Sequence, residues 1–66
     1  MNLLVNGQPR QAAERTTVGR LLEELGLPTR GIAVEVNQQI VPRQQHADHE
    51  LADGDRLEIV SLVGGG

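Results

Sequence analysis

A single short helical pattern, set between strand-like segments, limits what this chain can fold into. Four aliphatic residues recur at the i, i+3, i+4 and i+7 spacing that places one apolar stripe along a helix: Val18, Leu21, Leu22 and Leu25. Thr17 precedes them as an N-cap, while Gly26 and Pro28 follow as signals that end a helix. We therefore predict one helix over residues 18–25, with Leu22 in the core.

Two features of this predicted helix concern its other faces. Gly19 costs about 1 kcal/mol relative to Ala inside a helix, and we expect it to allow close contact with the sheet. Glu23 and Glu24 most simply form the solvated face, although they could instead meet a basic partner. The solvated interpretation is the simpler of the two.

The chain before the helix has the pattern of a β-hairpin. Residues 2–5 are mostly apolar, residues 8–13 are mostly polar, and Asn6-Gly7 between them is the strongest short signal for a two-residue type I′ turn. Pro9 has no N–H to donate to a neighbouring strand. We therefore expect the second arm to lie at an edge of the sheet.

Two further strand patterns follow the helix. Residues 32–36 alternate between large apolar and other side chains, as in a strand with one buried face. We expect a turn over residues 37–39 and then a short arm at residues 40–41 that ends at Pro42.

The longest β-rich run covers residues 56–63 and follows a turn at residues 53–55. Val60 and Leu62 fall on the opposite face of this run from Leu57. If Leu57 faces the core, two apolar side chains are left on the other face, and we expect that face to meet a partner.

The order strand, strand, helix, strand, strand favours an α+β fold of two layers, with the helix packed across one face of a mixed sheet. Placing the last strand beside the first buries the two most apolar strands in the centre. This arrangement is the β-grasp, or ubiquitin-like, fold. We expect one domain over residues 1–63, followed by a flexible glycine tail at residues 64–66.

Composition restricts the core and the partners. The chain has 66 residues with no Cys, Phe, Tyr or Trp, so its core must be aliphatic, without disulfides, and stacking on nucleic-acid bases is excluded. All six basic residues are Arg and the net charge is -3, which argues against a nucleic-acid partner. There is neither a signal-peptide pattern nor an apolar run of the ~20 residues that a membrane span needs, so we expect a cytoplasmic protein.

A polar segment after Pro42 has no convincing periodicity. It contains His46, Asp48 and His49, and imidazole and carboxylate groups are common metal ligands. Clustered polar residues in a surface loop are more often simply solvated, so we expect no metal site here. The short Asp spacing at residues 53–55 suggests calcium, but the twelve-residue loop with its final Glu is absent.

The chain ends in Gly64-Gly65-Gly66, where the reactive group is the α-carboxylate of Gly66. Three glycines have no side chains, so they could thread a narrow slot and reach roughly 10 Å beyond the folded edge. That reach suits delivery of a carboxylate into the active site of a partner. The alternative is an inert, frayed terminus.

Three stretches carry a resemblance to a known family. These are residues 33–43, with the sequence Ala-Val-Glu-Val-Asn-Gln-Gln-Ile-Val-Pro-Arg, the turn at residues 53–55, and the ending at residues 58–66. Together with the short length, they make the whole chain similar to the ThiS family of sulfur carriers in thiamine biosynthesis. A terminal Gly-Gly alone is less specific, because ubiquitin and the small subunit of molybdopterin synthase share it.

The resemblance implies a carrier that is a recycled co-substrate and not an enzyme. An E1-like (ThiF-like) enzyme would use ATP and magnesium to adenylate Gly66, and sulfur from a persulfide donor would then displace AMP to give a thiocarboxylate. Thiazole synthase (ThiG-like) would take that sulfur. No cofactor would be held permanently. Residues proposed to contact the adenylating enzyme are Glu58 or Asp55 for its basic groups, and Val60, Leu62 and Val63 for its apolar surface.

Three other interpretations remain open at this point. The chain could carry sulfur for another pathway, such as molybdopterin or an amino acid. It could be a ubiquitin-like modifier joined to target lysines through Gly66, although it has no Lys on which to build chains of itself. It could also be a β-grasp binding module with an inert tail. A hydrolase built from Ser61, His46 and Asp48 is disfavoured, since no base is expected beside the nucleophile.

Overall fold

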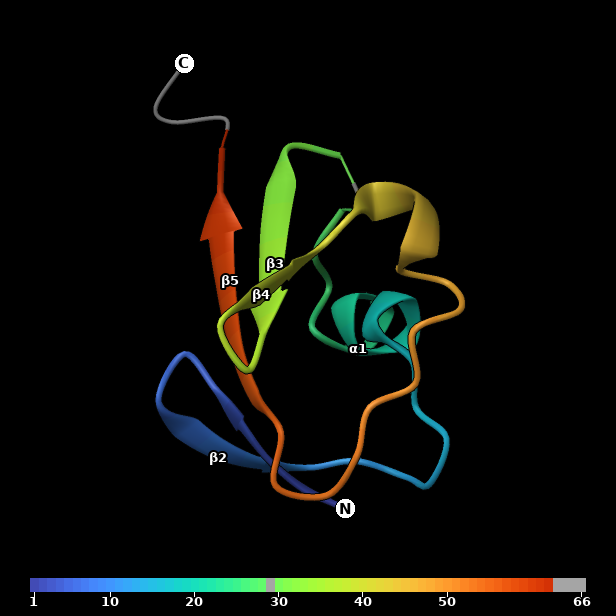
Figure 1. The fold of residues 1–66 in the computed structure, drawn as a ribbon, viewed down its shortest axis with the longest axis vertical. Coiled ribbons are helices and arrows are strands. Elements are labelled where there is room, and N and C mark those ends of the chain that lie inside the picture. The colour runs from blue at the N-terminus through green and yellow to red at the C-terminus, as the bar shows by residue number, and fades with distance from the viewer. Residues whose placement is uncertain (29, 63–66) are drawn as a thin grey trace.

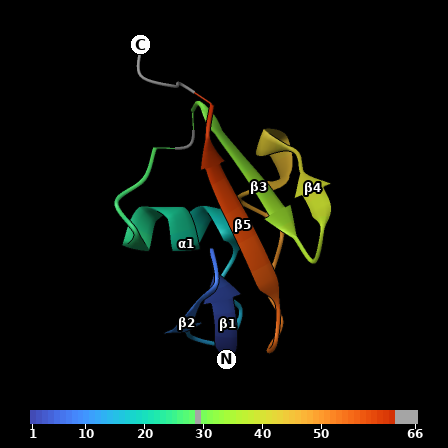
Figure 2. The ribbon, with the colours of Figure 1, turned by 90° about the vertical axis from the view of Figure 1, so that its left-hand side faces the viewer.

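The computed structural model describes residues 1–28 and 30–62. They form a five-stranded sheet with one helix, α1, lying across one side of it (Figure 1). Figure 2 shows α1 on one side of β5 and β3. The elements in chain order are β1 (Asn2–Val5), β2 (Gln8–Gln11), α1 (Val18–Glu24), β3 (Ile32–Val36), β4 (Gln39–Val41), a 3-10 turn η1 (Arg43–Gln45) and β5 (Arg56–Ser61).

The sheet is mixed, and its strand order is β2-β1-β5-β3-β4. The first and last strands, β1 and β5, are parallel neighbours, and every other neighbouring pair is antiparallel. The hairpin arm that contains Pro9 lies at the edge of the sheet, paired to β1. The predicted two-layer α+β arrangement, with the last strand placed beside the first, is therefore confirmed.

The helix begins and ends as its sequence signals predict. The Thr17 hydroxyl accepts a hydrogen bond of 3.1 Å from the backbone N–H of Arg20, which satisfies a donor that the first turn leaves free. At the other end, Gly26 adopts the left-handed region with a φ of 73°, which a residue without Cβ does at low cost. Leu25 is the C-cap, so α1 is one residue shorter than predicted.

Two strand boundaries differ from the sequence-based prediction. The β3–β4 turn uses two residues, Asn37 and Gln38, which both have positive φ, and Gln39 already pairs with Val36. The prediction that residue 39 lies in the turn was therefore wrong. A two-residue turn with both φ values positive matches the natural twist of a hairpin better than a longer one.

The core lies between α1 and the inner face of the sheet, and it is aliphatic throughout. Its buried members are Leu3, Val18, Leu21, Leu22, Val34, Val36, Val41, Leu51 and Leu57. The three α1 residues among them are fully buried, which confirms the predicted stripe. Burial of each Leu or Val contributes about 1.5 to 3 kcal/mol. Within the described residues, no helix has the length and apolar content that crossing a membrane requires.

Gly19 permits a close approach, but the neighbour is not the sheet. Its N–H donates a 2.8 Å hydrogen bond to the carbonyl of His46, and a Cβ built on Gly19 would lie 3.3 Å from that oxygen. The backbone after η1 is thus packed directly on α1. The expectation that Gly19 faces the sheet was wrong, because the segment between β4 and β5 covers this side of the helix.

Candidate functional site

The outer face of β5 carries three of the residues expected to contact a partner. Leu57 points into the core, whereas Glu58 and Val60 point outward on the side of the sheet away from α1. Val60 is 54% exposed, and Leu62, just past the strand, is 67% exposed. These two apolar side chains are open to solvent on the described chain. Their role in binding stays a prediction.

The register of β3 and β4 adds residues to this face that the sequence-based prediction missed. Val60 is paired with Ala33, Glu58 is paired with Glu35, and Glu35 is in turn paired with Ile40 on β4. Ile40 is 71% exposed, the highest value among the large hydrophobic residues that remain on the surface. The period-2 pattern of residues 32–36 already placed Glu35 outward, but its neighbours depend on strand pairing.

Glu35 and Glu58 form a like-charged pair on the outer face. They are directly opposite each other across β3 and β5. Like charges in that position destabilise a sheet. Within residues 1–28 and 30–62, both ion pairs involve Glu24, so neither Glu35 nor Glu58 is neutralised by an arginine at ion-pair distance. A basic group from a partner would relieve this repulsion.

Asn6 holds β5 next to the exposed apolar residues. Its side-chain oxygen accepts a 2.7 Å hydrogen bond from the N–H of Ile59, and its side-chain amide donates one of 3.2 Å to the Ile59 carbonyl. Its own backbone N–H donates to Leu57. Asn6 therefore continues the β1–β5 ladder with its side chain after β1 has ended. The sequence indicated an ordinary turn at Asn6 and gave no signal for this second role.

Asn37 makes a similar attachment at the start of β5. Its backbone N–H donates to the Arg56 carbonyl at 2.7 Å, and its side-chain oxygen accepts from the Arg56 N–H at 3.0 Å. Its amide also donates to Asp55 at 2.9 Å, while the other Asp55 oxygen accepts from the N–H of Ala52. Asp55 is thus engaged inside its own turn, and Glu58 is the better candidate for a basic partner.

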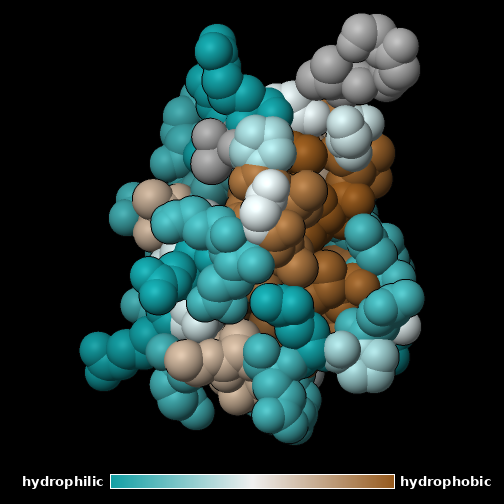
Figure 3. All heavy atoms as spheres, turned by 180° about the vertical axis from the view of Figure 1, so that it is seen from behind, coloured by the Kyte–Doolittle hydropathy of each residue, from teal (hydrophilic) through white to brown (hydrophobic). Residues whose placement is uncertain are grey.

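The chain is held to the sheet up to the last described residue. The N–H of Leu62 donates a 2.7 Å hydrogen bond to the carbonyl of Gly31. Seen from behind, hydrophobic residues form a band that starts beside this end of the chain (Figure 3). The expected tail at residues 64–66, the adenylation site Gly66, the contact residue Val63 and the domain boundary after residue 63 lie outside the described residues.

The polar cluster at residues 46–49 is not the solvated loop that we expected. His46 is 3% exposed, and its ring Nε2 lies 3.0 Å from the carbonyl of Val41. A carbonyl accepts only, so Nε2 must carry the proton and donate. Among the described residues, no group of three His, Asp or Glu side chains could hold a metal ion. His46 is instead a buried link between the segment after η1 and β4.

The glutamates of α1 differ from each other. Glu24 forms ion pairs with Arg20 at 3.4 Å and with Arg10 at 3.9 Å, so it links the helix to β2. Glu23 is exposed, as predicted for the solvated face. Both ion pairs are surface pairs, which typically contribute less than about 1 kcal/mol each.

Comparison with known proteins agrees with this geometry. The chain is 44% identical to the sulfur carrier protein ThiS of Escherichia coli K12, and the alignment covers all of both chains. It is 47% identical to part of a thiazole synthase from Paramagnetospirillum magneticum, of whose length the whole chain spans 20%. A crystal structure of a ThiS protein from Geobacter metallireducens is 35% identical, covers all of both chains and superposes with a TM-score of 0.84.

The structural match confirms that the fold is the β-grasp. A family model described as the ThiS family also matches residues 3–66, nearly the full length. With full-length similarity in sequence, in structure and to the family model, this chain belongs to the ThiS family.

Proposed function

We propose that this chain is a sulfur carrier in thiamine biosynthesis, and that the α-carboxylate of Gly66 is the group that receives the sulfur. The observation that supports this most is full-length similarity to a sulfur carrier protein in a chain that ends in three glycines. The geometry adds that an exposed apolar face on β5 precedes these glycines.

The chemistry explains why a partner enzyme is needed. A carboxylate is a poor electrophile because it is negatively charged and has no good leaving group. In the proposed cycle, a carboxylate oxygen of Gly66 attacks the α-phosphorus of ATP on an E1-like enzyme, which holds magnesium, and pyrophosphate leaves. A persulfide sulfur then attacks the acyl carbon and AMP leaves. A thiol cleaves the resulting S–S bond and releases the thiocarboxylate.

The carrier itself supplies the docking surface and the substrate end. Val60, Leu62 and Ile40 offer exposed aliphatic anchors, and such residues near the centre of an interface commonly carry much of its energy. The paired carboxylates Glu35 and Glu58 would accept a basic side chain and orient the complex. Because Asn6 attaches β5 to the sheet, this surface is preorganised and needs little ordering on binding.

Thiazole synthase is the proposed acceptor of the sulfur. Two relatives with that name, from Paramagnetospirillum magneticum and Magnetococcus marinus, contain a segment similar to the whole of this chain. Joining two proteins in one polypeptide raises their effective concentration toward each other. Such a fusion is favourable where the two must meet repeatedly, which supports the pairing for the separate chain as well.

The deciding experiment is an intact-mass measurement. The full chain is incubated with an E1-like adenylating enzyme, ATP, magnesium and a persulfide donor, and its mass should rise by the difference between one sulfur and one oxygen. Adding thiazole synthase and its other substrates should return the mass to its starting value. An unchanged mass with an enzyme that modifies another family member would contradict the proposal. A ladder of lysine conjugates in cell lysate would favour a protein modifier instead.

A further inference from the structure

A hollow of about 660 Å³ lies between the start of α1 and η1, away from the outer face of β5. Three of the six arginines of this acidic chain line it, namely Arg20, Arg30 and Arg43. Among the described lining residues, Glu23 is the one that carries a negative charge. The lining is therefore cationic, although the protein as a whole has a net charge of -3.

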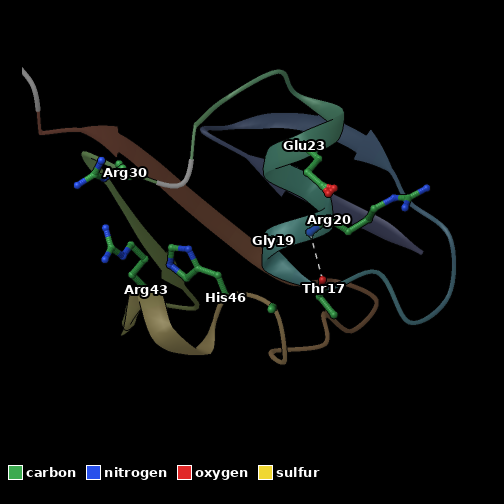
Figure 4. Close-up of a pocket in the computed structure, with 8 residues that line it drawn as sticks. Thr17, Gly19, Arg20, Glu23, Arg30, Arg43 and His46 are labelled. Carbon is green, nitrogen blue, oxygen red and sulfur yellow. Dashed lines mark hydrogen bonds between the residues drawn. The ribbon is translucent and has the colours of Figure 1, made fainter.

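Two of these arginines are free to bind a ligand. Arg20 is paired with Glu24 and extends away from the other two (Figure 4). Arg30 and Arg43 extend toward the same end of the hollow (Figure 4). In the described part of the chain, neither lies within ion-pair distance of a carboxylate. A guanidinium group presents N–H donors in a planar fork that matches the oxygens of a phosphate.

His46, which also lines the hollow, supplies an independent observation. Its side chain is buried, and within the described structure its ring Nδ1 has no hydrogen-bond partner. Because Nε2 donates to Val41, Nδ1 is an acceptor in the neutral ring. Buried polar atoms are nearly always hydrogen-bonded, so this acceptor calls for a donor. A phosphate that keeps a proton has both the oxygens that Arg30 and Arg43 need and the hydroxyl that Nδ1 needs.

The wall that carries His46 is fixed in place. The His46 carbonyl accepts the N–H of Gly19 at 2.8 Å, and the Val18 N–H donates to the carbonyl of His49 at 2.9 Å. The segment after η1 is thus attached to the first turn of α1 by two backbone hydrogen bonds. A site between two elements joined in this way is preorganised, so a ligand need not order the chain on binding.

We propose that this hollow binds a small phosphoryl anion through Arg30 and Arg43, with His46 Nδ1 accepting from its hydroxyl. The site is independent of the chemistry proposed for Gly66. The probes are inorganic phosphate, pyrophosphate and AMP, which share the phosphoryl group and differ in what it is attached to. The probe that binds with the lowest dissociation constant identifies the source of the group.

The test is an NMR titration of the ¹⁵N-labelled full chain with each probe, at constant ionic strength. We expect saturable shifts of the Arg30 and Arg43 side chains and of the His46 imidazole, with His49 as an internal reference. Arg43→Gln or Arg30→Gln should weaken binding about tenfold, since each removes a charged hydrogen-bond donor. Arg56→Gln, at an exposed position on β5, should leave the affinity unchanged. Glu23→Gln should tighten binding by removing the negative charge.

Sulfate separates the contribution of His46 from that of the arginines, because it has the shape of phosphate but carries no proton at neutral pH. We expect phosphate to bind more tightly than sulfate. Equal affinity for the two would overturn the role of Nδ1. Shifts that grow linearly without saturation for all three phosphoryl probes, or equal weakening by Arg43→Gln and Arg56→Gln, would overturn the site itself.

Discussion

Asn6 and Ile59 are 53 residues apart in the chain, yet the Asn6 side chain pairs with both the N–H and the C=O of Ile59. In effect, a side-chain amide takes the place of one peptide group in the β1–β5 ladder. Asn6 also has a φ of 50°, which the tight turn at the end of β1 requires. One residue thus forms the hairpin and holds the strand that leads to the glycines.

The two roles of Asn6 can be separated by substitution. Asn6→Gly keeps the positive φ easily but removes both hydrogen bonds, so we expect a loss of about 1 to 2 kcal/mol in the free energy of unfolding, measured in urea. Gln38→Gly is the matched control, because Gln38 also has positive φ and its side chain makes no hydrogen bond within the described structure. Equal effects of the two substitutions would mean that the amide of Asn6 contributes nothing.

Leu22 should be the most sensitive type of position in the core. It is fully buried on α1, and Leu22→Ala should lower the free energy of unfolding by about 2 to 5 kcal/mol. A domain this small has about 3 to 5 kcal/mol in total, so the variant should be largely unfolded at physiological temperature. Ile40→Ala, at an exposed site, should melt within a degree or two of the parent. A similar melting temperature for Leu22→Ala would contradict its assignment to the core.

Gly19→Ala tests the close approach of α1 to His46. Alanine favours a helix over glycine by about 1 kcal/mol, but its Cβ would lie 3.3 Å from the His46 carbonyl oxygen and 3.4 Å from the Ala47 Cα. These are backbone atoms, so they cannot rotate away, and we expect a net loss of stability of about 1 kcal/mol. Glu23→Ala on the exposed face should change stability by less than about 0.5 kcal/mol. A more stable Gly19→Ala would show that the segment after η1 can shift without cost.

Leu62→Asp tests the proposed docking surface. The side chain is 67% exposed, so the substitution should leave the melting curve nearly unchanged. On an interface it would place a charge where an apolar contact forms, and we expect at least a tenfold higher concentration for half-maximal adenylation. Glu14→Gln, an exposed change before the helix, serves as the control. If Leu62→Asp unfolds the protein, Leu62 belongs to the core and the surface lies elsewhere.

The tail should separate function from stability most sharply. Adding one Ala after Gly66 moves the carboxylate by about 3.5 Å, and a misplacement near 1 Å can already cost on the order of 10²-fold in rate. Pyrophosphate release by the adenylating enzyme should therefore nearly vanish, while the thermal melt stays the same. Gly65→Ala keeps the register but adds a methyl group, and it should be milder yet clearly impaired. Parental rates from the extended chain would show that Gly66 is not the reacting residue.

Local patterns in the sequence determined the elements of this fold. The stripe of α1 with its Thr17 cap, the Asn6-Gly7 turn and the alternation of residues 32–36 each depend on neighbours a few residues apart, so they can be read without the fold. The edge position of the Pro9 arm followed from a missing N–H. These features were enough to predict a β-grasp domain and an exposed apolar face near the chain end.

The tertiary structure alone decided which distant residues share a surface. Strand register placed Glu35 opposite Glu58 and Ile40 beside them, and the path of the segment after η1 buried His46 against Val41 and set it on Gly19. No local pattern encodes these contacts, because a polar side chain is buried or exposed according to what packs over it. Their energies depend on long-range pairing, which forms when the whole sheet closes around its aliphatic core.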